Sequence, residues 1–255
     1  MSRIVVTGSA DGLGLAAAEL LASQGHQVVG HARSRERADD LRRRVPALEA
    51  VVVGDAADLD AVRAMADELN ALGHFDAVIH NVGVGYHERH RVDTPQGHAH
   101  VLAVNVLAAY VLTARMTRPD RLVYLSSGMH YDGDTSLDDV DWLRRPWDGV
   151  QAYADSKLFD VTLALAVARR WPEVLSNAVE PGWVPTRMGG AGAPDDLTQG
   201  HVTQAWLATS HDGADHMTGG YLYHLRRKEP RPEAASADFE DRLLAVLEAL
   251  TGEAI

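Results

Sequence analysis

Short β-branched runs alternate with helix-length segments along almost the whole chain, and this alternation restricts the fold more than any other feature of the sequence. The expected strands are 4–7, 27–31, 50–53, 76–80, 121–125, 174–179 and 221–225. Strands that follow one another through a helix pair in parallel, and the helices then cover both faces of the sheet. We therefore expect an α/β fold, a three-layer doubly wound parallel sheet of about seven strands with helices on both faces.

No linker rich in proline, glycine or serine interrupts the 255 residues, so residues 1–255 are expected to form a single domain. The net charge of −12 argues against nucleic acid or an anionic membrane as a partner, because both require a basic face. A small-molecule partner is expected instead. Cysteine is absent, which excludes disulfides and thiolate catalysis.

The N-terminus runs directly into a strand pattern without a charged leader. No apolar run approaches the roughly 20 residues that are needed to span a bilayer. Together these features predict a cytoplasmic protein.

A glycine-rich turn at 7–14, Thr-Gly-Ser-Ala-Asp-Gly-Leu-Gly, connects the first expected strand to a helix. Such glycines let the backbone approach a pyrophosphate, and the N-terminus of the following helix favours its negative charge. A bare glycine pattern often marks only a tight turn, but the strand before it and the helix after it favour a nucleotide site. The expected cofactor-binding residues here are Gly8, Ser9, Asp11, Gly12, Leu13 and Gly14.

The tip of the second expected strand indicates which nucleotide binds. An acid at this position contacts the adenosine ribose of NAD, whereas a basic residue accommodates the 2′-phosphate of NADP. Here the chain continues with Arg33 and Ser34. NADP is therefore expected and NAD is less favoured, with Arg33 as the phosphate partner and Ser34 or Arg35 as a helper. The alternative is that Arg33, Arg35 and Arg37 belong to a solvated helix start, and Asp11 is a mild objection to a second phosphate nearby.

Polar residues also follow other expected strands. Because the carboxyl ends of parallel strands share one edge of a sheet, a single crevice could collect them. Asp55 could accept from an adenine amino group or be merely a turn acid. The residues concerned are Asp55, Ala56, Asn81, Val82, Gly83 and Ser127.

Tyr153 and Lys157 lie four residues apart on an expected helix and share one face. An ammonium close to the phenol is expected to lower its pKa from about 10 by up to about 3 units. Ser127 can donate to a carbonyl oxygen, and a nicotinamide over the strand ends can deliver hydride. The combination predicts a carbonyl reductase or alcohol dehydrogenase. Asn105, in an apolar helix expected at 97–116, is either a structural clasp or part of this polar site.

In this order the motifs resemble the short-chain dehydrogenase/reductase family over nearly the whole chain. The likeness rests on the glycine turn, Tyr153-x-x-x-Lys157, Asp55, Asn81-Val82-Gly83, Asn105, Ser127 and Pro181-Gly182-x-Val184-x-Thr186. It implies a Rossmann fold and an NADP-dependent oxidoreductase acting on a carbonyl or secondary alcohol of a small, apolar substrate. Val82 departs from the family, which usually has alanine there, and is expected to narrow the floor of the cofactor site.

The resemblance also implies roles for individual residues. Tyr153 would be the catalytic acid/base, and Lys157 would tune it and bind the nicotinamide ribose. Ser127, rather than its neighbour Ser126, would orient the carbonyl, and Asn105 would anchor a water-linked proton relay through Lys157. The implied cofactor contacts after the sixth strand are Pro181, Gly182, Val184 and Thr186, with Thr186 at the carboxamide.

Two long segments, near 128–150 and 183–200, are expected to be substrate loops. The stretch between Ser127 and Tyr153 and the shape of the C-terminal region are most similar to the retinol dehydrogenase and WW-domain oxidoreductase members of the family, without the membrane anchor or WW modules of those proteins. The aromatic residues of the two segments either line an apolar pocket or merely pack the loops. The candidates are His130, Tyr131, Trp142, Trp147, Trp183 and Met188.

A regulatory or sensor protein that binds NADP(H) with little turnover is the alternative function, disfavoured because the residues for chemistry are intact. Apolar helices around Asn105 and Leu158 predict a homodimer or homotetramer. With thirteen histidines chance clustering is easy, so no metal site is expected at His87, His90, His98 and His100.

Overall fold

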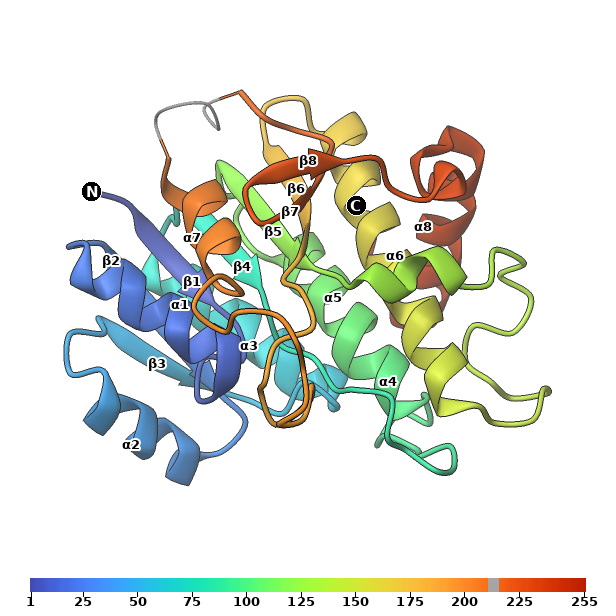
Figure 1. The fold of residues 1–255 in the computed structure, drawn as a ribbon, viewed down its shortest axis with the longest axis horizontal. Helices are drawn as coiled ribbons and strands as arrows, with labels where there is room; N and C mark the ends of the chain where they lie inside the picture. The colour runs from blue at the N-terminus through green and yellow to red at the C-terminus, as the bar shows by residue number, and fades with distance from the viewer. Residues whose placement is uncertain (211–215) are drawn as a thin grey trace.

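An eight-stranded sheet runs through the centre of the molecule (Figure 1). The computed structural model describes residues 1–210 and 216–255. The strand order is β3-β2-β1-β4-β5-β6-β7-β8, and every neighbouring pair is parallel except β7 with β8. The strands are β1 (Arg3–Val6), β2 (Gln27–Ala32), β3 (Ala50–Val53), β4 (Ala77–His80), β5 (Arg121–Leu125), β6 (Leu175–Glu180), β7 (Gly220–Tyr223) and β8 (Arg226–Lys228).

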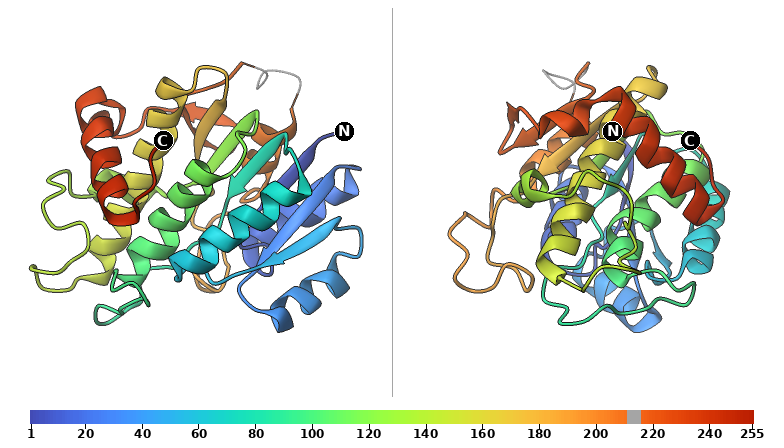
Figure 2. Two further views of the ribbon diagram at one scale, coloured as in Figure 1. Left: turned by 180° about the vertical axis from the view of Figure 1, so that it is seen from behind. Right: turned by 90° about the vertical axis from the view of Figure 1, so that its right-hand side faces the viewer.

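Helices cover both faces of this sheet. α1, α2 and α7 pack on one face. α3, α5 and α6 pack on the other, and α8 lies on the outer side of α6 (Figure 2). Among the described residues, no helix has both the length and the apolar character to cross a membrane. The helices are α1 (Gly12–Ser23), α2 (Arg35–Arg44), α3 (Leu59–Leu72), α4 (His100–Leu102), α5 (Ala108–Arg115), α6 (Gly149–Arg170), α7 (Val202–Thr209) and α8 (Ala237–Thr251), with a π-helical turn η1 (Ala103–Leu107) and 3-10 helices η2 (Gly128–Asp132) and η3 (Pro232–Ala235).

The central strands of the sheet are mostly apolar on both faces because both faces are buried. In β1, Ile4 and Val6 belong to the core with α1 and α7. Val5, between them, belongs to the core with α3, α5 and α6. This alternation follows from the two-residue period of a strand, and the predicted three-layer, doubly wound sheet is confirmed.

The direction of the strand order changes between β1 and β4. The chain adds β2 and β3 outward on one side of β1 and then crosses to β4 on the other side. At such a point the loops after the two central strands diverge and leave a crevice where ligands bind. Gly8 follows β1 and Asn81 follows β4, so the predicted nucleotide turn lies at this crevice.

The last edge of the sheet differs from the prediction of one strand at 221–225. β7 ends at Tyr223, and a turn at His224 and Leu225 leads into antiparallel β8, which makes eight strands rather than about seven. Both turn residues have positive φ, 46° and 64°, as in a type I′ hairpin. Such turns usually carry asparagine or glycine, so a His-Leu pair is not recognisable as a turn in the sequence.

α6 is buried by its own chain along most of its length. Leu158 and Phe159 are 0% and 2% exposed, and α8 packs against α6 through residues that include Leu243 and Leu247. The apolar surface that suggested a second copy is therefore covered within one chain. A homodimer or homotetramer stays a prediction, and the apolar character of α6 no longer supports it.

His80, the last residue of β4, predicts a loss of stability in acid. Its buried ring stacks on Tyr124, and Nε2 lies 3.2 Å from the hydroxyl of Thr113. Burial lowers the pKa of His80 to about 3, whereas the unfolded chain titrates near 6.5. The unfolded state therefore takes up this proton first as the pH falls. We expect His80 to remove about 1.4 kcal/mol of stability per pH unit below pH 6.5.

Denaturant unfolding between about pH 7.5 and about pH 5 measures this slope. His80→Gln should flatten it by the stated amount. His90→Gln, at an exposed histidine, is the control and should leave the slope unchanged. Equal slopes for the unaltered chain and His80→Gln would contradict the assignment.

Candidate active site

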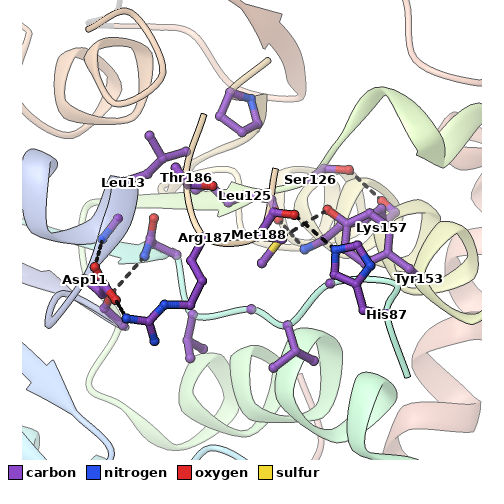
Figure 3. Close-up of a pocket in the computed structure, with 18 residues that line it drawn as sticks. Asp11, Leu13, His87, Leu125, Ser126, Tyr153, Lys157, Thr186, Arg187 and Met188 are labelled. Carbon is purple, nitrogen blue, oxygen red and sulfur yellow. Dashed lines mark hydrogen bonds and ion pairs between the residues drawn. The ribbon is translucent and has the colours of Figure 1, made fainter. Parts of the chain in front are cut away.

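A cleft runs along the carboxyl ends of the strands where β1 and β4 meet (Figure 3). Its larger part, a cavity of about 450 Å³, reaches from the glycine turn to Tyr153 and Lys157. A second cavity of about 250 Å³ continues toward the ends of β2 and β3. The two form one elongated site, because they share Gly8, Asp11, Val82, Gly83, Val84 and Arg187.

Gly8 lets the ends of β1 and β4 approach each other. Its φ is +65°, and a Cβ here would lie 2.8 Å from the Cα of Val82. Only glycine satisfies both conditions without strain. Val82, the departure from the family pattern, packs against Gly8 and lines both parts of the cleft.

Thr7 and Asn81 join the same two strand ends by hydrogen bonds. Thr7 Oγ1 accepts from the backbone N–H groups of Asn81 at 2.9 Å and Val82 at 3.1 Å. Asn81 Nδ2 donates to the carbonyl oxygens of Thr7 at 3.0 Å and Gly8 at 3.3 Å. Asn81 therefore lines the cleft as predicted, with its amide donors committed to the framework.

His31 in β2 makes a third connection, which joins the glycine turn to the end of β3 and which the sequence analysis missed. The N–H of Gly8 donates to Nδ1 at 2.9 Å, and Nε2 lies 2.8 Å from the carbonyl oxygen of Gly54. The accepting Nδ1 requires the proton to be on Nε2, which makes the ring neutral. Burial lowers the pKa of His31, although Gly54 and Asp55 oppose this, and the ring therefore stays neutral.

Two residues of the predicted turn lie behind the cleft. Ser9 is fully buried, and its hydroxyl lies 2.8 Å from the N–H and 3.3 Å from the carbonyl oxygen of His31. A Cβ at Gly14 would overlap Asn81 Nδ2 and the carbonyl oxygen of Gly8. Both residues support the turn from behind the cleft, and their contact with the cofactor stays a prediction. The turn residues that line the cleft are Gly8, Asp11, Gly12 and Leu13.

Three arginines lie along the far end of the cleft. Arg33 and Arg37 line it after β2, and Arg187 reaches it from the loop after β6 (Figure 3). Asp11 pairs with Arg37 at 3.4 Å and Arg187 at 3.0 Å. Burial would raise the pKa of Asp11, but the N–H of Gly12 and the two arginines outweigh it and lower the pKa. The acid that argued against a phosphate is thus paired, and Arg37 and Arg187 are cations that sequence reasoning did not place here.

The other residues predicted at this end are partly engaged in local structure. Ser34 caps α2 by accepting from the N–H of Arg37 at 3.3 Å, and it is not among the lining residues. Asp55 accepts from the N–H of Ala57 at 3.0 Å, which makes it a turn acid, yet it lines the cleft together with Ala56.

Tyr153, Lys157 and Ser127 meet at the opposite end, between α6 and β5. Ser127 lies beside Tyr153 and acts through its side chain to lower the pKa of the phenol, and Lys157 Nζ lies 5.7 Å from the centre of the tyrosine ring. The same Nζ donates to the carbonyl oxygen of Leu125 at 2.9 Å and to Asp160 at 2.7 Å. The fold therefore brings the predicted catalytic side chains together and adds Asp160, which the sequence analysis missed.

Ser126 and Ser127 have different partners. Ser126 Oγ is buried and donates to the carbonyl oxygen of Lys157 at 2.7 Å (Figure 3). Ser127 begins η2, where its Oγ accepts from the N–H of Met129 at 3.2 Å. His130 Nδ1, 2.8 Å from the carbonyl oxygen of Ser127, holds this turn in place. Ser127 is thus the serine whose side chain acts on the tyrosine, whereas Ser126 is the one of the two that lines the cavity.

The expectation of a lowered tyrosine pKa was wrong for this structure. Burial is the largest influence and raises the pKa of Tyr153, which is 7% exposed. Lys157 and Ser127 act to lower it, whereas Asp160 and Tyr86 add to the rise. The simple estimate counted the ammonium but neither the desolvation of a phenolate nor the carboxylate beside the ammonium. Tyr153 is therefore kept protonated.

Asn105 lies in η1, where a π-helical turn interrupts the expected helix, which begins only at His100. Its Oδ1 accepts from the N–H of Val84 at 2.8 Å. Nδ2 donates to the carbonyl oxygen of Val84 at 3.1 Å and to Ser156 Oγ at 2.9 Å. Asn105 is therefore a clasp between the segment after β4 and α6. Its part in a proton relay stays a prediction.

The loop after β6 covers Tyr153. The sulfur of Met188 lies 4.0 Å from the tyrosine hydroxyl, and Tyr86 packs edge-on at 5.6 Å between ring centres. His87 Nε2 lies 3.3 Å from the carbonyl oxygen of Met188 and joins the two covering segments.

Residues of the Pro-Gly motif in this loop divide into two groups. Pro181 and Thr186 line the cleft as predicted. Val184 is buried and Gly182 has a φ of +88°, and neither is among the lining residues. Both shape the loop, and their contact with the cofactor stays a prediction.

The tryptophans of segment 128–150 pack the segment itself. Trp142 and Trp147 form a T-shaped pair with centres 5.5 Å apart, and Arg145 lies 3.6 Å over Trp142. Trp147 Nε1 donates to the carbonyl oxygen of Glu88 at 2.9 Å. For these two residues the packing alternative holds.

Two histidines of the group 87, 90, 98 and 100 are paired with different carboxylates. His98 pairs with Asp141 at 2.7 Å, and His100 pairs with Glu88 at 2.5 Å. Within residues 1–210 and 216–255, no three His, Asp or Glu side chains are grouped so that they could hold a metal ion.

The close packing at Gly14 predicts that this position cannot carry a side chain. The added methyl group of Gly14→Ala would push away the carbonyl oxygen of Gly8 and the side chain of Asn81. We therefore expect a loss of about 1–3 kcal/mol in the free energy of unfolding. Gly192→Ala is the control, since a Cβ there meets nothing within 4 Å. Denaturant unfolding of both variants checks this, and equal stability of the two would contradict the packing argument.

Comparison with known proteins agrees with this geometry. The family model described as enoyl-(acyl carrier protein) reductase matches residues 8–217. The short-chain dehydrogenase chry4 of Gibberella zeae is 37% identical over 99% of this chain and 98% of its own length. A candidate daunorubicin C-13 ketoreductase of a Streptomyces species is 32% identical over 89% of this chain and 84% of its own. Human retinol dehydrogenase 13 is 27% identical over 98% of this chain and 84% of its own, in line with the resemblance noted in the sequence.

A solved structure shows the same fold. A short-chain dehydrogenase from Burkholderia cenocepacia, in complex with NADP, superposes with a TM-score of 0.67 over 87% of this chain and 95% of its own, at 23% identity. The matches in sequence, the doubly wound sheet and the ordered site residues agree, and the chain is an oxidoreductase of the short-chain dehydrogenase/reductase family.

Proposed function

We propose that this protein is an NADP(H)-dependent oxidoreductase that interconverts a carbonyl and a secondary alcohol on a small, mostly apolar molecule. The observation that carries the proposal is that Tyr153 and Lys157 line one end of a cleft, with Ser127 beside the tyrosine. The other end of the same cleft holds Arg33 and Arg37. Proton-transfer groups and phosphate-binding groups are thus separated along one elongated site.

The residues fit a nicotinamide dinucleotide. A Cβ at Gly12 would meet nothing within 4 Å, so the backbone of the turn is open toward the cleft. Arg33 and Arg37 follow β2, where a 2′-phosphate requires cations. The Burkholderia protein of the same fold is described with NADP, which supports this cofactor. When bound, the nicotinamide supplies hydride to the carbonyl carbon.

Three side chains would then manage the proton. Ser127 donates a hydrogen bond to the carbonyl oxygen, and the hydroxyl of Tyr153 transfers its proton to that oxygen. The ammonium of Lys157 stabilises the phenolate that remains. Because burial keeps Tyr153 protonated, the free protein holds this residue in the protonation state that reduction of a carbonyl requires.

The substrate is proposed to be a ketone. The name of the Streptomyces relative points to ketone reduction. Beside Tyr153 the cleft is lined by Val84, Met188 and His87, which offer apolar contacts and one polar group to a carbonyl compound.

Tyr153→Phe tests the proton donor. We expect turnover with NADPH and a reducible ketone to fall by at least about 10²-fold, because general acid catalysis contributes this much. Binding of NADPH, measured by fluorescence, should persist. Full turnover would contradict the proposed mechanism, and NADPH binding without turnover of any carbonyl by the unaltered protein would favour a sensor instead.

The adjacent serines form a matched pair for the same assay. Ser127→Ala should lower turnover strongly. Ser126→Ala removes a buried hydrogen bond to the carbonyl oxygen of Lys157 at a residue that lines the cavity, so it should cost about 1 kcal/mol of stability and lower turnover less than Ser127→Ala does.

Arg33→Ala and Arg37→Ala test the cofactor assignment. Each removes a cation beside the proposed 2′-phosphate, so NADPH should bind more weakly by about tenfold or more, while NADH binding stays the same. Titration of both nucleotides checks this. Arg42→Ala, on the same helix but paired with Asp39, is the control. Equal weakening for both nucleotides would contradict a 2′-phosphate site.

A further inference from the structure

Asp160 is a buried carboxylate that the proposed mechanism does not use. It lies on α6 one turn after Lys157 and is 2% exposed. Its Oδ2 accepts from Lys157 Nζ at 2.7 Å. An unpaired charge in such a place is costly, so this contact with the ammonium is the reason that a carboxylate can remain there.

The ammonium of Lys157 is held by two fixed acceptors. It has three N–H donors, of which one is directed to the carbonyl oxygen of Leu125 and one to Asp160. Lys157 also lines the cleft, and Nζ lies 3.8 Å from where a Cβ of Gly83 would stand. One donor therefore remains for the cleft, and its direction is set by the other two.

We propose that Asp160 is a positioning residue for Lys157. The carboxylate of Asp160 fixes the position of the ammonium and competes with Tyr153 for the positive charge of that ammonium, so that the charge on Asp160 controls how readily Tyr153 ionises. The inference rests on the proposed function for its meaning in catalysis, but the contacts that carry it are present in the protein alone.

The charged and titratable groups around Asp160 come from two elements. Among the residues that the structure describes, Lys157 is the charged group that acts on this carboxylate. Asp160 in turn acts on Tyr153 of α6 and on Tyr124 of β5, and it raises the pKa of both phenols. His80 stacks on Tyr124 and is neutral, because burial lowers its pKa to about 3.

The sign of the effect follows from these contacts. Burial raises the pKa of Asp160 to about 6, although Lys157 opposes the rise. Above that pH the carboxylate is charged, partly cancels the ammonium and disfavours a phenolate at Tyr153. Below it the protonated acid leaves the full charge of Lys157 to act on the tyrosine. Asp160 thus makes Tyr153 a weaker acid at neutral pH than Lys157 alone would.

Asp160→Asn separates charge from position, because the amide oxygen can still accept from Lys157. The appearance of tyrosinate is followed by ultraviolet difference absorbance against pH in the protein without nucleotide. The titration of Tyr153→Phe is subtracted from that of the unaltered chain, and the titration of the double variant Tyr153→Phe/Asp160→Asn is subtracted from that of Asp160→Asn. Each difference isolates the signal of Tyr153. We expect Asp160→Asn to move its ionisation down by about one pH unit or more.

Asp155→Asn is the matched control. Asp155 is also buried on α6, but it pairs with Arg145 at 2.5 Å and not with Lys157. Its substitution removes a buried ion pair of the same kind and should leave the titration of Tyr153 unchanged. Asp160→Leu removes charge and acceptor together, and it should in addition weaken NADPH binding, which Asp160→Asn should preserve.

The outcomes distinguish this inference from the proposed function. A tyrosinate titration that is the same with and without Asp160→Asn, or that Asp155→Asn shifts equally, would overturn the role of Asp160. The role of Asp160 would also be overturned if the ammonium of Lys157 lost its proton while no tyrosinate formed. Absence of turnover with carbonyl compounds would count against the proposed function alone, because the titration needs neither substrate nor cofactor.

Discussion

The close approach of the ends of β1 and β4 is the constraint on which the site depends. Gly8 has no side chain to hold Val82 away, and Thr7 and Asn81 satisfy each other's backbone groups across the gap. With these polar groups paired, the two loops can diverge over opposite faces of the sheet and leave a cleft without exposing unsatisfied backbone. Both parts of the cleft, the proposed cofactor end and the end with Tyr153, extend from this junction.

Charge along the cleft runs against the charge of the whole chain. The molecule carries −12, yet the cleft is lined by Arg33, Arg37, Arg187 and Lys157. Low-dielectric walls strengthen such a local field, which would attract the proposed anionic dinucleotide while the acidic exterior repels other polyanions. At both ends an acid tempers the cations: Asp11 at the phosphate end and Asp160 at the catalytic end.

Local patterns predicted most elements within a few residues, since buried strands and helices reveal themselves by period and by Gly or Pro at their ends. The exceptions have specific causes. β8 is short and fully polar, and the turn before it uses His224 and Leu225 in place of the usual residues. Asn105 was recognised as requiring partners, but only the folded chain shows that Val84 and Ser156 are those partners.

By itself the sequence determined the fold class, the nucleotide turn and the pairing of Tyr153 with Lys157, because each of these follows from residues near one another in the chain. Tertiary structure alone decided that Ser9 and Gly14 support the turn, that Ser127 rather than Ser126 acts on the tyrosine, and that His31 and Arg187 join the site. It also reversed the expected pKa shift of Tyr153. Burial and long-range pairing set ionisation, and neither can be counted before the chain has folded.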